Sequence, residues 1–389
     1  AGSIVVEGND SAAISVETAI DGSVRTAGTI AVTGDRSFGV HTTGAVGGDV
    51  AILSTVAAAG QGSVGVAPDG DVGGKLIIGN TVNATGFRYT TRPADAAVAK
   101  LDADDLLIGG PAVRVRGDVY GGLLVDAPPP DLDKDDADED KDGIPDAQET
   151  TGTVSSFGSA PAILVGSESR DVRLGVGGTG VNAYGANIKG LVQAAGVYDG
   201  VNATAIQLGG LGGKVTIDGG VRVGGAVAAT AAKGSAVGIA LGAGASTPSL
   251  KVDGGAIKAS ASATEAVDVR AVRVDAGASL GYLGNSGEIS AAITGTKGSA
   301  TAILDASGTL SLIENVNKIA ATITPTDTTQ AVTGQAVAMD LRANPSGVTV
   351  RQGANNSSTI TPTIIGDVLF GSGPARLELL AGVLNGAVA

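Results

Sequence analysis

The sequence lacks cysteine and tryptophan, and aromatic residues make up only 2% of its 389 positions. A chain without cysteine gains no stability from disulfides. A globular core of this size normally relies on large aromatic side chains, whereas the 43% of hydrophobic residues here are mainly Ala, Val, Ile and Leu. Small and β-branched residues suit thin, regularly stacked strands. The composition therefore favours a repetitive β-protein.

Long apolar runs and clustered basic residues are also missing. No run of 18 apolar residues is present, so the sequence predicts no transmembrane helix. The net charge of −14 argues against a nucleic-acid partner, because phosphate binding needs clustered Lys and Arg. Residues 126–149 hold 11 acidic residues against Lys134 and Lys141, a net −9. The acidity thus belongs mainly to one segment.

A repeat of 26 residues dominates the first part of the chain. Aliphatic, glycine and serine positions recur together, as in the sets Ile4, Ile30, Val56, Val82; Gly8, Gly34, Gly60, Gly86; Ser11, Ser37, Ser63; Ile14, Val40, Val66; and Ile20, Val46, Val72, Val98. Short strands separated by glycine corners account for this pattern. Stacked units place identical aliphatic residues above one another, about 4.8 Å apart.

Beyond residue 150 the repeat continues with looser spacing. Strand signatures that begin at Ile206, Ile239, Val272 and Ile303 recur after 33, 33 and 31 residues. Variable spacing around a constant strand pattern indicates loops that bulge from a constant cross-section. Coils of about 25 residues would give roughly 14 to 16 coils and a rod near 70 Å long.

These observations predict an all-β fold, a right-handed parallel β-helix. Residues 1–125 form N-terminal coils, residues 126–150 an acidic insertion, and residues 151–389 C-terminal coils.

The repeat has the pattern Thr-Ile-x-Val-x-Gly-x-x-Ser-x-Gly-Val followed by Gly-Gly-x-Val/Leu. This pattern resembles the passenger region of bacterial autotransporters, especially those of Alphaproteobacteria. Residues 364–379 are similar to the last coils before the membrane-anchoring barrel in that family. The resemblance implies secretion across the outer membrane of a Gram-negative bacterium and folding outside the cell. It also implies a chain that is either released or tethered by a β-barrel not present here.

The acidic segment contains the spacing of a 12-position calcium loop. Its expected ligands are Asp138, Asp140, Asp142, the carbonyl of Ile144, Asp146 and Glu149, with Gly143 at the sharp turn. Hard oxygen ligands in a flexible loop suit Ca²⁺. The Asp-Gly-Ile-Pro-Asp string resembles thrombospondin type 3 repeats. Asp131, Asp133 and Asp135 have the same alternate spacing and are candidates for a second, weaker site, although Asp136 stands where the motif needs glycine. The alternative interpretation of the whole segment is a solvated acidic linker.

Catalytic motifs are sparse. His41 is the only histidine, which leaves no zinc motif and favours a structural role. The glycine run 175–180 matches a dinucleotide-binding pattern but is expected to be a turn, since no βαβ unit surrounds it. The pairs Asp268 with Asp275 and Asp305 with Glu314 have the residue types of a glycosidase or lyase, but turn capping is the default interpretation.

Three classes of function follow from this sequence. The first is a non-enzymatic surface stalk or adhesin, located outside the cell, whose partner is a host, cell-surface or matrix ligand. The second is a self-associating subunit of a filament or surface layer, since an uncapped coil end exposes unpaired backbone groups. The third, least favoured, is a β-helical enzyme acting on polysaccharide.

Overall fold

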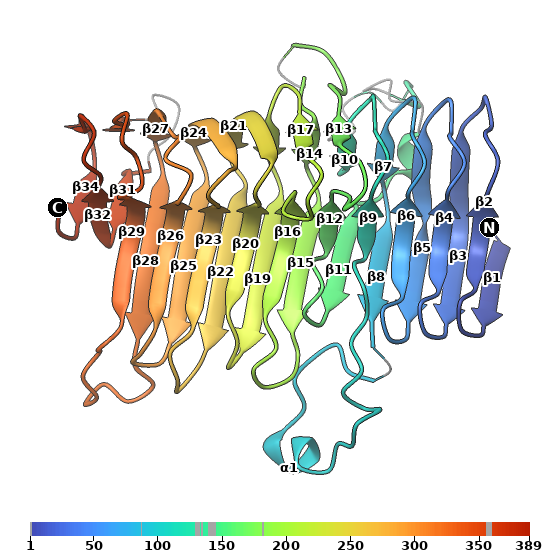
Figure 1. Ribbon diagram of the computed structural model, residues 1–389, viewed down its shortest axis with the longest axis horizontal. Coiled ribbons are helices and arrows are strands. Elements are labelled where there is room, and N and C mark those ends of the chain that lie inside the picture. Colours follow the sequence, from blue (N-terminus) through green and yellow to red (C-terminus); the bar gives the residue numbers. More distant parts are fainter. Residues whose placement is uncertain are drawn as a thin grey trace.

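The chain forms a parallel β-helix, in agreement with the predicted fold class. The computed structural model describes residues 2–86, 88–128, 133, 135–138, 145–180, 183–354 and 360–389. Strands lie side by side along one axis, with the N-terminus at one end of the rod and the C-terminus at the other (Figure 1). Among the described residues, no helix has the length and apolar character that crossing a bilayer requires.

Three parallel ladders of strands make up the rod, and neighbouring strands in each ladder belong to successive coils. The first ladder contains β1 (Gly2–Glu7), β3 (Val24–Thr33), β5 (Val50–Ala59), β8 (Thr81–Thr85), β11 (Thr153–Phe157), β15 (Leu191–Gly196), β19 (Ala226–Ala232), β22 (Ala256–Ser262), β25 (Glu288–Thr294), β28 (Lys318–Thr324), β31 (Thr363–Ile365) and β34 (Val383–Asn385). The second ladder contains β2 (Ala12–Val16), β4 (Phe38–Thr42), β6 (Val64–Pro68), β9 (Val113–Val115), β12 (Ile163–Val165), β16 (Ala203–Leu208), β20 (Ala236–Leu241), β23 (Asp268–Val274), β26 (Ser299–Asp305), β29 (Gln335–Leu341) and β32 (Asp367–Phe370).

The third ladder starts from the first residues of β3 and β5 and continues through β7 (Leu76–Ile78), β10 (Leu123–Val125), β14 (Ala186–Ile188), β18 (Val221–Val223), β21 (Ala245–Val252), β24 (Ser279–Asn285), β27 (Leu312–Asn315), β30 (Thr349–Gln352) and β33 (Arg376–Leu379). Strands β13 (Val172–Leu174) and β17 (Val215–Ile217) join it at the start of β21.

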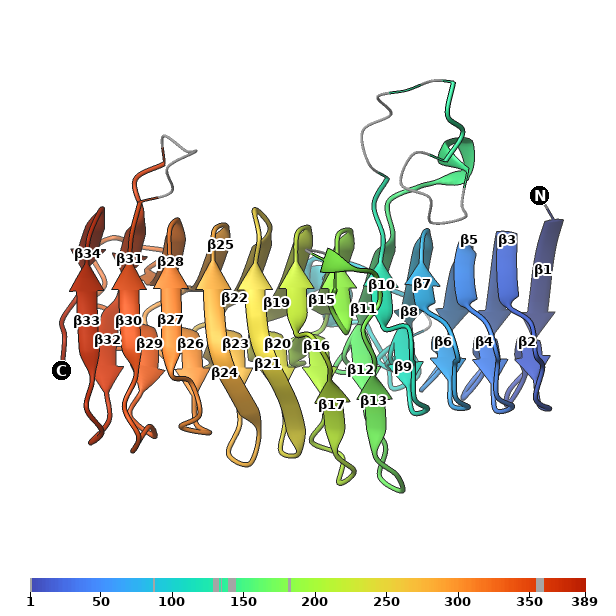
Figure 2. The same ribbon diagram turned by 90° about the horizontal axis from the view of Figure 1, so that it is seen from above.

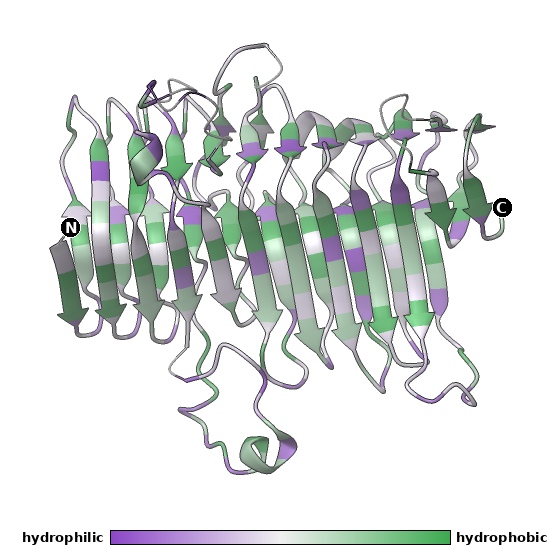
Figure 3. Cartoon of the chain, turned by 180° about the vertical axis from the view of Figure 1, so that it is seen from behind, coloured by the Kyte–Doolittle hydropathy of each residue, from purple (hydrophilic) through white to green (hydrophobic). Residues whose placement is uncertain are grey.

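One aliphatic row runs through the whole first ladder. Each member pairs with the next, in the order Ile4, Ile30, Val56, Val82, Val154, Val192, Val227, Ile257, Ile289, Ile319, Ile364 and Leu384. Its first four members are those of the predicted 26-residue register, which is confirmed at these positions. Because side chains alternate between the two faces of a strand, every second residue of each coil enters the core. Figure 3 shows mainly hydrophobic strands and more hydrophilic loops.

Glycine and serine form stacked corners between the first and second ladders. Gly34 and Gly60 adopt φ values of +154° and +138°, and a Cβ on either would collide with the backbone of the coil before it. The hydroxyl of Ser37 donates to the Gly8 carbonyl at 2.8 Å, and Ser63 donates to Gly34 in the same way. The repeat therefore retains these residue types for backbone geometry and for hydrogen bonds at a buried turn.

A second excursion, which sequence patterns do not predict, interrupts the register between β8 and β9. Val98 is expected from its spacing to follow Val72 in the row of Ile20 and Val46, but it lies in the short helix α1 (Asp95–Val98) outside the rod. Val119 takes its place beside Val72. Asp118 and Asp71, at matching positions, are 47 residues apart instead of 26. The prediction for Val98 is wrong because an apolar residue at the expected spacing belongs to an inserted loop.

The number of coils is also lower than predicted. In the part of the chain that the structure describes, the second ladder has 11 strands and the aliphatic row of the first has twelve members, so the repeating part of the rod is about 50 Å long at about 4.8 Å per coil. The estimate of 14 to 16 coils fails because two excursions consume residues without adding coils. Later coils also take more residues: paired positions in β20 and β23 are 33 apart.

The core stays continuous across the acidic segment. Val82 pairs with Val154, and Leu123 pairs with Ala186, so strands from both sides of residues 126–150 stack directly. Figure 2 shows the chain leaving the rod after β10 and returning at β11. The acidic segment is thus an excursion from one uninterrupted stack.

Candidate functional site

The acidic segment is described only in part. Of the expected calcium ligands, Asp138, Asp146 and Glu149 lie among the described residues, whereas Asp140, Asp142 and Ile144 lie outside them, as does Asp131 of the expected second site. Asp146 begins a 3-10 turn, Asp146–Gln148, and its backbone N–H donates to the Ala137 carbonyl at 2.9 Å. This bond joins the ninth position of the expected loop to the residue immediately before its first position.

The described residues of the second expected site form a local turn. Asp133 accepts a hydrogen bond from the backbone of Asp135 at 3.1 Å, and its carbonyl accepts one from Asp136 at 3.0 Å. Asp126, at the base of the segment, is buried and forms an ion pair with Lys189 at 2.9 Å. The segment is therefore anchored to the rod where it departs.

A different acidic group lies on the excursion that carries α1. The carboxylates of Asp102, Asp104 and Asp105 come within 4.8 Å of one another and can hold a metal ion, the one such group in the described part of the chain. A hydrogen bond between the carboxyl groups of Asp102 and Asp104 lowers the pKa of Asp102 and raises that of Asp104. Asp105 also pairs with Arg88 at 2.8 Å. Sequence patterns do not indicate this group, because its spacing matches no metal motif.

The carboxylates considered as catalytic pairs have structural partners. Asp305 is buried and accepts backbone hydrogen bonds from residues 307, 308 and 310 at 3.0–3.1 Å, which makes it a turn cap as expected. Asp268 pairs with Arg270 at 3.1 Å and Asp275 with Arg273 at 2.9 Å. The fourth, Glu314, lies elsewhere, in the groove described below.

His41 also has a packing role. Its ring stacks on Phe38 with centroids 4.1 Å apart, and its Nε2 lies 2.9 Å from Asp69. Arg114 bonds the same carboxylate at 2.6 Å. Burial acts to raise the pKa of Asp69, but the hydrogen bonds from His41 and Arg114 outweigh it and hold that pKa below its usual value. These contacts account for the histidine without catalysis.

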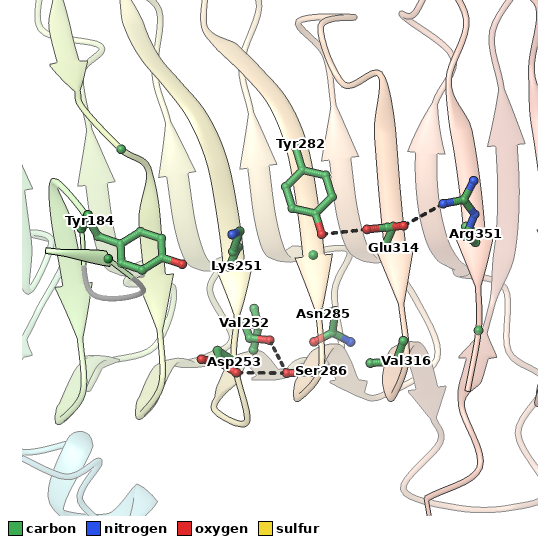
Figure 4. Close-up of a pocket in the computed structure, with 15 residues that line it drawn as sticks. Tyr184, Lys251, Val252, Asp253, Tyr282, Asn285, Ser286, Glu314, Val316 and Arg351 are labelled. Carbon is green, nitrogen blue, oxygen red and sulfur yellow. Dashed lines mark hydrogen bonds and ion pairs between the residues drawn. The ribbon is translucent and has the colours of Figure 1, made fainter. Parts of the chain in front are cut away.

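A groove of about 800 Å³ runs along the outer surface of the third ladder (Figure 4). Successive coils contribute Lys251 from β21, Tyr282 from β24, Glu314 from β27 and Arg351 from β30, and Tyr184 stands at the end nearer the N-terminus. Its floor includes Lys251, Gly284, Glu314 and Arg351, which pair in that order on neighbouring strands. Residues far apart in sequence thus line one strip because the coils stack in register.

Gly284 is the one member of this floor without a side chain, and the ring of Tyr282 occupies the space. A Cβ at position 284 would lie 2.5 Å from the Tyr282 hydroxyl oxygen and 3.0 Å from its Cζ. Any larger residue would therefore displace the ring. The glycine lets the tyrosine lie along the surface of the rod, where it presents a flat aromatic platform.

Charged partners fix Tyr282 in place. Its hydroxyl donates to Glu314 at 3.0 Å, Glu314 pairs with Arg351 at 2.9 Å, and Arg351 pairs with Glu378 at 2.6 Å. Burial, and then the hydrogen bond to the Glu314 carboxylate, raises the pKa of Tyr282 to about 12. Glu378 also pairs with Arg376 at 2.7 Å, so the two carboxylates and two guanidinium groups neutralise one another, and the Tyr282 ring is held in place.

Lys251 differs from the other charged residues of the groove. No carboxylate within the described residues pairs with it, and its Nζ lies 5.8 Å from the centre of the Tyr184 ring, in a cation–π contact. The neighbouring Asp253 is engaged by Arg222 at 2.7 Å. Ser286 closes the lower rim by donating to the Val252 carbonyl at 3.2 Å. The groove therefore combines two tyrosine rings with one ammonium group between them.

Only part of this site is recognisable from the sequence. Tyr282 lies near acidic residues in the chain, but Tyr184 is almost a hundred positions earlier and its place depends on the coil lengths between. The expected turn at 175–180 does bring Gly180 to the groove wall. No family model, curated protein or solved structure matches the chain.

Proposed function

We propose that this chain is a non-enzymatic extracellular rod, a surface stalk or adhesin of a Gram-negative bacterium, of the kind found in autotransporter passengers. The observation that carries the proposal is the uninterrupted row of twelve aliphatic residues through the first ladder. A stack in which every coil contacts only its neighbours is stiff and elongated, and it can hold loops and a lateral surface at a distance from an anchoring point.

The acidic residues considered for catalysis are already engaged in hydrogen bonds and ion pairs, which supports a binding role over a catalytic one. Asp305 caps a turn, and Glu314 is held between the Tyr282 hydroxyl and Arg351. A general acid or base needs a carboxyl group that can exchange a proton with a substrate. Carboxylates committed to turn caps and ion pairs are poorly suited to that task.

The test of the adhesive role has two arms. Antibodies against the chain should label intact cells of the source organism as strongly as permeabilised ones. Beads coated with the purified chain should resist shear on cell or matrix surfaces better than beads coated with an unrelated acidic protein. Absence of both surface labelling and retention would contradict the proposal, as would turnover of any glycan by the purified chain.

We also propose that residues 126–150 bind Ca²⁺ through Asp138, Asp140, Asp142, Ile144, Asp146 and Glu149. The support is the ligand spacing together with the closure of the loop between Asp146 and Ala137. Bound calcium would neutralise a segment that otherwise repels itself, so it would order the excursion. Calorimetry should give saturable heat for the wild type and much less for Asp140→Ala, and no heat from the wild type would remove this part of the proposal.

Self-assembly into a filament or surface layer is the second candidate. Strand β1 pairs with β3 and β34 with β31, and in the described structure the other edge of each has no strand partner. Apolar side chains are exposed there: Val5 is 67% exposed and Leu380 is 70% exposed. Unpaired edges of this kind promote association. Light scattering with and without EDTA separates the candidates, because a calcium-dependent polymer favours the filament and a monomer in both conditions favours the stalk.

A further inference from the structure

We propose that the groove along the third ladder binds an acidic oligosaccharide, a chain containing uronic acid or similar carboxylated sugars, laid along the rod axis. The inference gives the proposed adhesive rod its ligand class and rests on that proposed function. Three features support it: the rings of Tyr184 and Tyr282, the fixed orientation of the Tyr282 ring, and Lys251, which lies between the rings and has no carboxylate partner among the described residues.

The tyrosine rings match the apolar faces of sugar rings. Tyr184 and Tyr282 are each half-buried, so one part of each ring is anchored and another part faces the groove. An aromatic face that is fixed in advance costs little conformational entropy on binding. Tyr282 meets this condition, because Gly284 gives it room and the chain Glu314–Arg351–Glu378 holds its hydroxyl.

The shape of the groove fits a chain better than a compact ligand. Its lining comes from consecutive coils between β14 and β30, which succeed one another every 4.8 Å or so along the axis. A linear polymer laid across these coils meets similar backbone and side-chain positions at regular steps. Pyranose rings joined in an extended chain repeat on a comparable length scale.

Charge selects among sugar chains. Glu314, Arg351 and Asp253 are each neutralised by a partner in the chain, so their fields largely cancel. Lys251 is the cation that remains, and it projects from the groove floor beside the Tyr184 ring. A carboxylate on a sugar stacked against that ring would reach the ammonium group and form a charge-assisted hydrogen bond. A neutral oligosaccharide has no carboxylate to form this ion pair with Lys251.

The experiment is a calorimetric titration of the full chain with hexagalacturonate, cellohexaose and a polyglutamate of equal charge. The proposal expects saturable binding of hexagalacturonate, at least about tenfold tighter than that of the other two ligands. Lys251→Gln and Tyr282→Ala should each weaken it by about tenfold or more, whereas Lys214→Gln and Tyr120→Ala, exposed controls outside the groove, should leave it unchanged.

Gly284→Val provides a variant that removes no groove side chain. It should weaken binding as much as Tyr282→Ala does, because it displaces the ring, and circular dichroism shows whether each variant keeps its β-structure. If the wild-type chain does not bind hexagalacturonate, or binds polyglutamate or cellohexaose equally well, the proposal that the ligand is an acidic oligosaccharide is overturned. If these variants fail to alter bead retention under shear while retention itself persists, the adhesive role stands and the groove assignment falls.

Discussion

Ile257 offers the sharpest test of how the stack is stabilised. The residue is fully buried in β22, between Val227 and Ile289 of the aliphatic row. Its Cγ2 also fills the space above Gly238 in the opposite ladder, where a Cβ would come within 2.7 Å of it. Ile257→Ala therefore opens a cavity that neither the neighbouring coils nor the facing glycine can fill.

Such a loss should cost about 2–5 kcal/mol, and the smaller deletion Ile257→Val about 0.5–1.5 kcal/mol. Ser262→Ala, at an exposed position of the same strand, serves as the matched control and should change stability by less than about 0.5 kcal/mol. In a solenoid each coil interacts with its neighbours, so the loss should concentrate in β19, β22 and β25.

Native-state hydrogen exchange is the suitable assay, since long repeat arrays depart from two-state unfolding. The free energy of local opening would be read for each strand along the rod. An Ile257→Ala variant that matches Ser262→Ala would refute the cavity argument. A uniform loss over the entire rod would refute nearest-neighbour stabilisation.

Three further outcomes are expected. Hydrogen bonds from Arg92 and Lys233 lower the pKa of Asp199 from 3.8 to about 2. The ion pair that anchors the α1 excursion is therefore complete above about pH 4 and is lost as the pH falls towards 2. Hydrogen exchange of α1, corrected for intrinsic rates, should accelerate over that range in the wild type but not in Asp199→Asn. Glu314→Gln should lower the pKa of Tyr282 from about 12 yet keep it above 10.0, because burial is its main cause, and NMR titration of ¹³C-labelled tyrosine measures this directly. Calcium at a hundred times its Kd should slow proteolysis within residues 126–150 about a hundredfold, an effect that EDTA reverses and that Asp140→Ala lacks; equal rates in calcium and EDTA would count against the site.

The repeat is the predictable part of this fold. Stacking in register demands that aliphatic residues recur at the coil length, so Ile30, Val56 and Val82 can be aligned from their spacing alone. Val98 shows where this logic fails. An inserted loop can carry an apolar residue at the expected spacing, and only pairing with Val72 distinguishes it from Val119.

The groove is not predictable from the sequence for a related reason. Which outward residues become neighbours depends on every coil length between them, and these lengths vary after residue 150. Tyr184 and Lys251 meet only because the intervening coils are of one particular size. Gly284 carries a usable signal, since a glycine inside a strand often marks the close approach of another group. Its spacing alone does not reveal that the group is the ring of Tyr282.

The most direct test of a lateral groove that binds without catalysis is one NMR titration. The ¹³C-tyrosine-labelled chain, which has five tyrosines, would receive hexagalacturonate while the ring signals and the anomeric signals of the sugar are followed together. The account predicts that the Tyr184 and Tyr282 signals shift saturably, that the Tyr120 signal stays in place, and that the anomeric signals keep their intensities. Unshifted groove tyrosines, or new reducing-end signals from a cleaved sugar, would contradict it.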